Sequence, residues 1–129
     1  MNKEYIKIKS KEEEIIKILE KREDLEAKRM LRFLNLPDLS REKSSPLYEL
    51  VQRIRGIKRF SNFDEVDAPE IVRADVSFDL FNFPSDHPAR SKSDTYYADD
   101  SHILRTHTTV MWYYYLNNEI IKERIKNKL

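Results

Sequence analysis

The amino-acid sequence predicts an α+β fold, with helices at both ends of the chain and short extended segments between them. Apolar residues recur at helical spacing before residue 37 and after residue 110, whereas short apolar groups interrupted by prolines occupy residues 63–106. The chain has 129 residues, of which 40% are apolar and 11% aromatic. This length and composition suit one ordinary domain with a modest core.

The first part of the chain, residues 1–37, reads as an N-terminal helical segment. Ser10 followed by Glu13 has the spacing of a capping box, in which the serine oxygen accepts a backbone N–H and the glutamate reaches back to the cap. The apolar residues after it are Ile15, Ile18, Leu19, Leu25, Met30, Phe33 and Leu34. Pro37 ends the pattern because proline cannot donate a backbone hydrogen bond. We therefore expect one helix here, followed by a polar connector over residues 38–45.

Further helices are predicted after the connector and at the C-terminal end. Ser45 can cap a helix that has Pro46 at its first position. The apolar stripe of this helix consists of Leu47, Leu50, Val51 and Ile54. Another helix is expected from residue 110 to 116, and Asn118 can cap a final amphipathic helix that lacks an obvious partner.

Residues 63–106 predict short strands joined by an ordered loop. Apolar residues on both sides of Pro69 indicate extended segments, and a proline is tolerated at the edge of a sheet. Residues 76–100 contain prolines and several aromatic residues, and we expect a long ordered loop because aromatic side chains need burial. A further strand is expected over residues 103–106.

Composition excludes several kinds of site. The chain contains no cysteine, so disulfides and thiolate metal sites are absent, and no apolar stretch approaches the roughly 20 residues that span a bilayer. We expect a cytoplasmic protein without a membrane segment. Gly56 is the only glycine, which excludes glycine-rich phosphate loops. Residues 1–60 carry a net charge of +5 and residues 61–109 carry −6, so charge alone does not support a nucleic-acid-binding surface.

Three spaced motifs carry most of the functional information. They are His87-Pro88-Ala89-Arg90, Asp94-Thr95-Tyr96-Tyr97 and Leu104-Arg105-Thr106-His107-Thr108-Thr109. Together with Ala68-Pro69-Glu70-Ile71, they resemble the phenylalanine–tRNA ligase alpha subunits, a family of class II aminoacyl-tRNA synthetases, over residues 46–116. The resemblance implies part of the antiparallel-sheet core of a class II synthetase, here preceded by the N-terminal helix.

The resemblance also implies roles for individual residues. His107 and Thr109 correspond to the histidine and the hydroxyl of the family's phenylalanine pocket, where they can orient an ammonium or carboxylate group. Trp112 stands where the family usually has glutamine, so either substrate recognition is rearranged or the indole packs in the core. Pro69 marks motif 1, which builds the subunit interface of the family, and Ala68 replaces a usual glycine.

For the parent enzyme, the resemblance implies phenylalanine, tRNA(Phe), and ATP with Mg²⁺ as reactants and cofactors. It also implies a beta subunit and a second alpha subunit in a heterotetramer. Motif 2 and the glycine-rich motif 3, which bind the phosphates, are not recognisable here. We therefore expect a fragment of an alpha subunit in which residues 46–129 form a partial catalytic core. We assign no catalytic residue, and we expect no strong binding of ATP or Mg²⁺ and no activation by this chain alone. The family's helical hairpin that contacts tRNA is not evident either, which makes tRNA binding by this chain doubtful.

Two other functions fit the same sequence. One is a non-catalytic synthetase paralogue that acts as a protein-association or weak RNA-binding module, and the other is a plain helical domain with coincidental motifs. Arg90 and Arg105 could contact phosphates, or they could form structural ion pairs. The acids close to them in sequence are Asp86, Asp94, Asp99 and Asp100. His102 and His107 with these acids lack a recognised metal-ligand spacing, so no metal site is expected.

Overall fold

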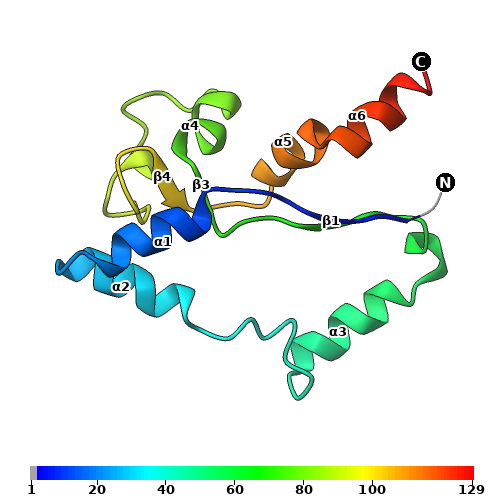
Figure 1. The fold of residues 1–129 in the computed structure, drawn as a ribbon, viewed down its shortest axis with the longest axis horizontal. Coiled ribbons are helices and arrows are strands. Elements are labelled where there is room, and N and C mark those ends of the chain that lie inside the picture. The colour runs from blue at the N-terminus through cyan, green and yellow to red at the C-terminus, as the bar shows by residue number, and fades with distance from the viewer. Residues whose placement is uncertain (1–2) are drawn as a thin grey trace.

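The computed structural model describes residues 3–129 and has the mixed α+β character that the sequence predicts (Figure 1). The helices are α1 (Glu12–Glu20), α2 (Leu25–Leu34), α3 (Pro46–Arg55), α4 (Ala74–Ser77), α5 (Val110–Asn117) and α6 (Glu119–Lys126). The strands are β1 (Tyr5–Lys7), β2 (Glu65–Asp67), β3 (Ile71–Arg73) and β4 (His102–Leu104). Short 3-10 turns occupy Lys58–Phe60, Asp79–Phe81 and Pro88–Arg90.

The N-terminal segment forms two helices, so the prediction of a single helix is wrong. The carboxylate of Asp24 caps α2 by accepting the backbone N–H of Ala27 at 2.9 Å, and it also pairs with Arg22 at 2.7 Å. α1 and α2 then pack side by side as a helical hairpin (Figure 1). Leu25, which the apolar pattern placed on the buried face, is 80% exposed. Neither glycine nor proline marks the turn, so the two helices read as one pattern in the sequence.

Of the three predicted helix caps, Ser45 and Asn118 are confirmed as N-cap residues. The hydroxyl of Ser45 accepts the N–H of Leu47 at 3.2 Å, and the Asn118 side chain accepts that of Ile120 at 3.0 Å. The predicted Ser10–Glu13 capping box is wrong, because Lys11 is the N-cap residue of α1 and Ser10 instead accepts the N–H of Glu12 at 3.3 Å. Local hydrogen-bonding chemistry therefore sets the start of these helices.

β3 and β4 form an antiparallel pair with a core on each of its two faces. Ile71 lies opposite Leu104, and Val72 lies opposite Ile103. Because side chains alternate along a strand, the first pair faces one cluster and the second pair faces the other. The hairpin cluster contains Ile15, Leu19, Ala27, Met30, Ile71 and Ala98. The second cluster contains Val72, Val76, Phe78, Ile103 and Val110. The N-terminal hairpin thus shares a core with β3.

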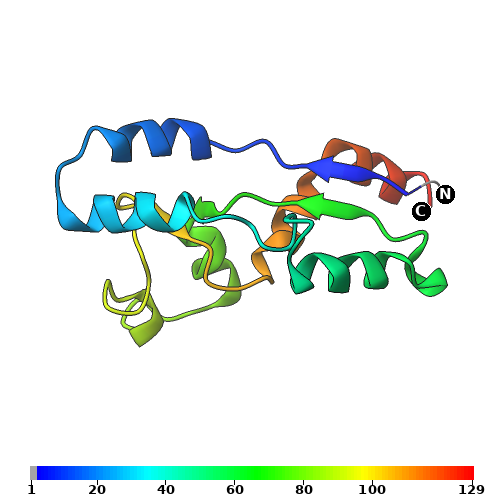
Figure 2. The same cartoon turned by 90° about the horizontal axis from the view of Figure 1, so that it is seen from below.

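A second, parallel pair joins the N-terminal strand to the middle of the chain. β1 lies beside β2 with Ile6 opposite Val66 (Figure 2). Ile6 is buried, whereas its neighbours Tyr5 and Lys7 are exposed. The sequence analysis assigned no strand to residues 5–7, because the partner of this short alternating segment lies about sixty residues away.

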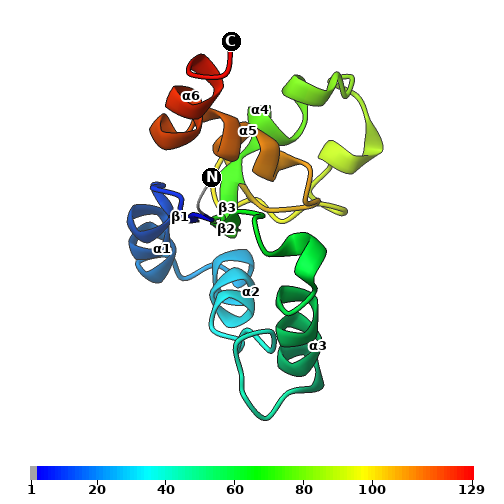
Figure 3. The same ribbon diagram turned by 90° about the vertical axis from the view of Figure 1, so that its right-hand side faces the viewer.

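α3 stands apart from both cores. None of its residues is buried, and the Leu47, Leu50 and Ile54 side chains are 49%, 52% and 45% exposed. Figure 3 shows α3 at the opposite side of the molecule from α5 and α6. The apolar stripe predicted from the sequence exists, and these three side chains stay about half exposed within residues 3–129.

The long loop predicted over residues 76–100 is ordered around short turns. It contains the second half of α4 and two 3-10 turns, and Tyr97 forms an isolated antiparallel bridge with Ile103 at its end. Across residues 3–129, every helix is too short or too polar to cross a membrane.

Candidate functional site

His107 follows β4 and is held by the segment at the end of α4. Its Nε2 atom lies 3.1 Å from the carbonyl oxygen of Ser77, and its ring meets Phe81 edge to face with centroids 5.3 Å apart. A carbonyl oxygen can only accept, so Nε2 carries a hydrogen; in the neutral ring, Nδ1 is then an acceptor. Within residues 3–129, neither Nδ1 nor the Ser77 hydroxyl has a hydrogen-bond partner, although both are shielded from solvent. A ligand donor could satisfy this nitrogen.

Arg90 fixes the segment that carries Ser77. Its guanidinium lies 5.2 Å from the centre of the buried Phe78 ring and pairs with Asp79. The sequence suggested Asp86 or Asp94 as its acidic partner, and the structure shows that Asp79 takes this place. Arg90 therefore has a structural role, and its charge is occupied within the chain.

The first two sequence motifs hold each other in place. The Thr95 hydroxyl donates to the Ala89 carbonyl at 2.6 Å, and the Tyr97 hydroxyl donates to the Arg90 carbonyl at 2.7 Å. Arg90 in turn donates to the Phe83 carbonyl at 2.5 Å. These bonds explain why the motifs combine small hydroxyl, aromatic and guanidinium groups at fixed spacing.

The third motif supports the turn at Pro69. Nη1 of Arg105 lies 3.3 Å from the carbonyl oxygen of Pro69 and 3.4 Å from that of Ala68. Pro69 itself is buried. The expected acidic partner Asp99 instead contacts Nδ1 of His102 at 2.9 Å. Arg105 therefore braces the backbone between β2 and β3.

Thr109 is the N-cap residue of α5, and Trp112 lies on its first turn. Thr109 is exposed and its hydroxyl makes no capping bond to α5. Trp112 is 62% exposed and meets Tyr115 edge to face, with ring centroids 6.1 Å apart. Within residues 3–129 the indole therefore lies outside both core clusters.

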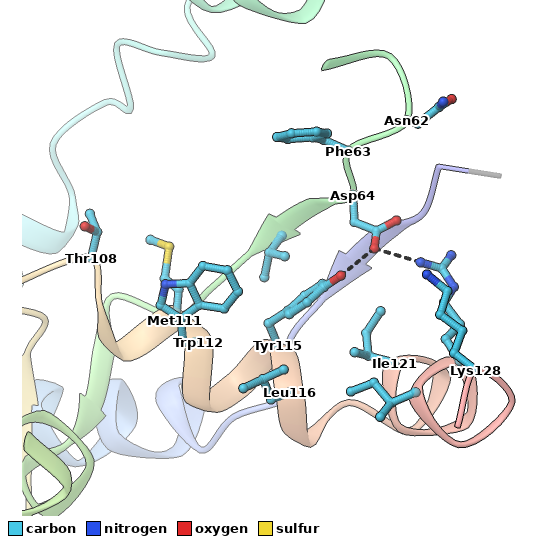
Figure 4. Close-up of a pocket in the computed structure, with 13 residues that line it drawn as sticks. Asn62, Phe63, Asp64, Thr108, Met111, Trp112, Tyr115, Leu116, Ile121 and Lys128 are labelled. Carbon is cyan, nitrogen blue, oxygen red and sulfur yellow. Dashed lines mark hydrogen bonds and ion pairs between the residues drawn. The ribbon is translucent and has the colours of Figure 1, made fainter. Parts of the chain in front are cut away.

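Trp112 lines an open groove of about 740 Å³ between residues 62–66 and the helices α5 and α6 (Figure 4). Its lining is mainly apolar and includes Phe63, Val66, Met111, Leu116 and Ile125. Thr108 lies at the same groove, whereas His107 contacts Ser77 and Phe81 as described above. The sequence analysis did not predict this groove, because it is built from segments about fifty residues apart.

Asp64 joins three elements at one end of this groove. Its carboxylate accepts the backbone N–H of Glu4, the hydroxyl of Tyr115 and the guanidinium of Arg124, each at 2.8 Å. Burial tends to raise the pKa of Asp64, but these hydrogen bonds outweigh it and hold the pKa below its ordinary value. Burial and the bond to Asp64 raise the pKa of the Tyr115 hydroxyl. The network joins β1, α5 and α6 to the N-terminal end of β2.

The remaining charged groups do not form a metal centre. Throughout residues 3–129, no three His, Asp or Glu side chains converge in a way that could hold a metal ion. A polar cavity of about 640 Å³ is lined by residues of β3, β4 and the Pro88–Arg90 turn. Its charges include the pairs Arg73–Asp75 and Arg90–Asp79, which are satisfied within the chain.

Comparison with known protein families identifies the family to which this chain belongs. The family model described as tRNA synthetases class II core domain (F) matches residues 33–126, from the end of α2 to the end of α6. The chain belongs to this class II synthetase family. The matched residues include the three sequence motifs, Pro69 and most of the residues that line the groove. Most of the N-terminal hairpin precedes the matched residues, although it packs against β3 of the synthetase core domain.

The curated relatives of this synthetase domain include several phenylalanine–tRNA ligase alpha subunits. That of Aquifex aeolicus is 35% identical over 106 residues, which cover 79% of this chain and 30% of the relative. Those of Mycoplasmoides gallisepticum and Cellvibrio japonicus are 45% and 42% identical over 64 residues, covering 50% of this chain and 19% of each relative. The chain thus spans a fifth to a third of the length of these relatives. No solved structure matches this chain.

Proposed function

We propose that this chain is part of a phenylalanine–tRNA ligase alpha subunit and contributes motif 1 and one wall of the phenylalanine pocket. In the assembled enzyme the pocket serves ATP-dependent charging of tRNA(Phe). The observation that carries the proposal is the buried Nδ1 acceptor of His107, within a motif that matches the family. An amino-acid ammonium group is a donor of the kind that this nitrogen lacks.

Thr109 and Trp112 complete the proposed substrate-binding set. The Thr109 hydroxyl is exposed at the start of α5 and can both donate and accept. The Trp112 indole can only donate, in contrast to the amide usual in the family, so we propose that this side of the pocket recognises substrate through packing.

We further infer that residues 46–129 form the partial catalytic core, after the helical segment 1–37 and the connector 38–45. The two arginines that could have bound ATP phosphates are engaged elsewhere, Arg90 with Asp79 and Arg105 with backbone carbonyls. The described residues therefore do not fit an ATP–Mg²⁺ site, and we assign no catalytic residue. These 129 residues alone are proposed to be inactive in amino-acid activation, in a cytoplasmic parent enzyme.

Partner subunits follow from the same proposal. The exposed stripe of α3, which precedes the motif 1 turn at Pro69, would be covered by a second alpha subunit, and a beta subunit would complete the heterotetramer. The same stripe favours the second candidate function, a non-catalytic module for protein association. Sedimentation of residues 1–129 with and without Leu50→Glu distinguishes a self-associating stripe from one that stays free.

The test of the pocket is a chimera in which residues 46–126 replace the matching segment of the Aquifex aeolicus alpha subunit, combined with its beta subunit. Phenylalanine-dependent ATP–pyrophosphate exchange is measured for the chimera and for residues 1–129 alone. His107→Ala should lower exchange by about 10- to 100-fold, because a hydrogen bond to a charged substrate group is lost. Thr106→Ala, which changes an exposed neighbour, is the matched control. Equal exchange in both variants would reject the role of His107.

A further inference from the structure

Residues 79–83 form a closed turn shortly after α4. The carbonyl oxygen of Phe78 accepts the backbone N–H of Phe81 at 3.1 Å and that of Phe83 at 3.0 Å. Asn82 reverses the chain with a left-handed φ of 58°, a conformation that asparagine tolerates better than most residues. The Phe81 side chain is half-buried against the second cluster. The backbone of the turn therefore gives this ring a defined position.

Arg90 joins the two ends of this turn. Its guanidinium pairs with Asp79 at the start of the turn and donates to the Phe83 carbonyl at the end, at 2.5 Å. The same group lies 5.2 Å from the centre of the Phe78 ring, whose face stabilises the positive charge. A lysine ammonium has neither a flat face nor several N–H groups in a fixed fork. The contact with both ends of the turn therefore requires arginine.

Two contacts from this region hold the His107 ring. The Ser77 carbonyl lies 3.1 Å from Nε2, and the Phe81 ring meets the imidazole edge to face at 84°, with centroids 5.3 Å apart. The first contact selects the nitrogen that carries the hydrogen, and the second keeps the ring from turning away from that carbonyl. Within residues 3–129, Nδ1 has no hydrogen-bond partner that could favour the other tautomer. The tautomer of His107 therefore depends on the position of the turn.

We propose that Arg90 and Phe81 are positioning residues for His107. Arg90 holds the turn, Phe81 keeps the imidazole against the Ser77 carbonyl, and Nδ1 stays available as an acceptor for a substrate ammonium group. An acceptor that is already oriented loses less entropy on binding than one that must first change its rotamer or tautomer. This inference rests on the pocket role of His107 proposed above. Neither Arg90 nor Phe81 is proposed to touch the substrate.

Long-range proton–nitrogen NMR spectra of residues 1–129 at about pH 9, where imidazole rings are neutral, read the tautomer of each histidine. His107 should show a protonated Nε2 and an unprotonated Nδ1. His102, whose Nδ1 lies 2.9 Å from the Asp99 carboxylate, should show the reverse and is an internal reference. In Arg90→Lys and in Phe81→Leu, the two nitrogen shifts of His107 should move toward each other as the tautomers mix, while those of His102 stay in place.

Matched controls change residues of the same kind elsewhere in the chain. Arg41→Lys alters an arginine that bridges two carboxylates, and Phe33→Leu alters a ring that packs edge to face on Tyr96. Neither control should move the nitrogen shifts of His107. Unchanged His107 shifts in the two test variants, or equal changes in the controls, would overturn the proposal. Circular dichroism of each variant shows that the fold is retained.

Phenylalanine-dependent exchange by the chimera described above separates this inference from the proposed function. Phe81→Leu should lower kcat/KM for phenylalanine by about tenfold, because the acceptor is misplaced. In the His107→Ala chimera the same substitution should cause no further loss, because the residue through which Phe81 acts is gone. A full additional loss would overturn the positioning role. If the tautomer responds as expected but His107→Ala leaves exchange unchanged, the positioning of the ring is supported and the pocket role of His107 is rejected.

Discussion

The carboxylate of Glu12 accepts the backbone N–H of Ile71 at 2.9 Å and thereby joins the first turn of α1 to the start of β3. The same oxygen also accepts the N–H of Glu70 at 2.8 Å. These bonds occupy backbone groups just after Pro69, at the edge of β3 that has no strand partner within residues 3–129. An N-terminal helix thus stabilises the edge of the synthetase core.

Replacing Glu12 by alanine should lower the free energy of unfolding by about 1–3 kcal/mol, because two backbone donors lose their acceptor. Glu12→Gln, which keeps an acceptor oxygen, should lose less. Urea unfolding followed by circular dichroism measures both changes. Glu13→Ala is the control, since Glu13 is exposed on the same turn of α1. An equal shift for Glu12→Ala and Glu13→Ala would contradict this role.

Asp64→Ala should destabilise the chain by about 3 kcal/mol. The substitution leaves the half-buried guanidinium of Arg124 without this acceptor and also frees the Tyr115 hydroxyl and the Glu4 N–H. Glu119→Ala, which removes an exposed partner of Lys122, should change stability by less than about 0.5 kcal/mol. Thermal unfolding of the two variants makes the comparison, and similar melting temperatures would show that the Asp64 network adds little.

Stability should fall in acid through Asp24. Hydrogen bonds from Arg22 and from the backbone of Ala27 lower the pKa of this carboxyl from 3.8 to about 2. A depressed folded-state pKa contributes stability that is complete above the unfolded value, and that is lost as pH falls from about 4 to about 2. NMR titration of the carboxyl carbon reads this pKa directly. Asp24→Asn should reduce the loss of folding stability in acid, whereas Glu23→Gln should leave this loss unchanged. An equal loss in the two variants would refute the assignment of this pH dependence to Asp24.

Trp112 is the single tryptophan of the chain, so its fluorescence reports one environment. Because the indole is 62% exposed at the groove, its emission should resemble that of tryptophan in water, and iodide should quench it efficiently. Trp112→Gln should change the free energy of unfolding by less than about 0.5 kcal/mol, as expected for an exposed position. Blue-shifted emission with weak iodide quenching would contradict this prediction, because it would show that the indole is buried.

Features determined by neighbouring residues were predictable from the sequence. Ser45 with Pro46 and Asn118 mark helix starts because their side chains act on N–H groups two residues away. The α+β class followed from the change in apolar period along the chain. The three motifs also identified the family, since their residue types are tied to one another by the Thr95 and Tyr97 bonds.

Features that depend on distant contacts were not predictable. The turn between α1 and α2 is set by Asp24, a residue that reads equally well as part of one continuous charged helix. Arg90 pairs with Asp79 rather than with acids closer to it in sequence, because its guanidinium lies over the ring of Phe78, next to Asp79. The groove beside Trp112 and the Asp64 network require segments that meet only in the folded chain. The roles of His107 and Thr109 stay predictions.

The pairing of β1 with β2 constrains how the protein can be made. Tyr5 leaves the ribosome about sixty residues before Glu65, its partner in the pair. Until then Ile6 stays exposed in the nascent chain. Arg124, which joins α6 to the residue before β2, is synthesised later still. The N-terminal strand therefore cannot pair until β2 has been synthesised. In the meantime its unpaired edge is accessible to chaperones.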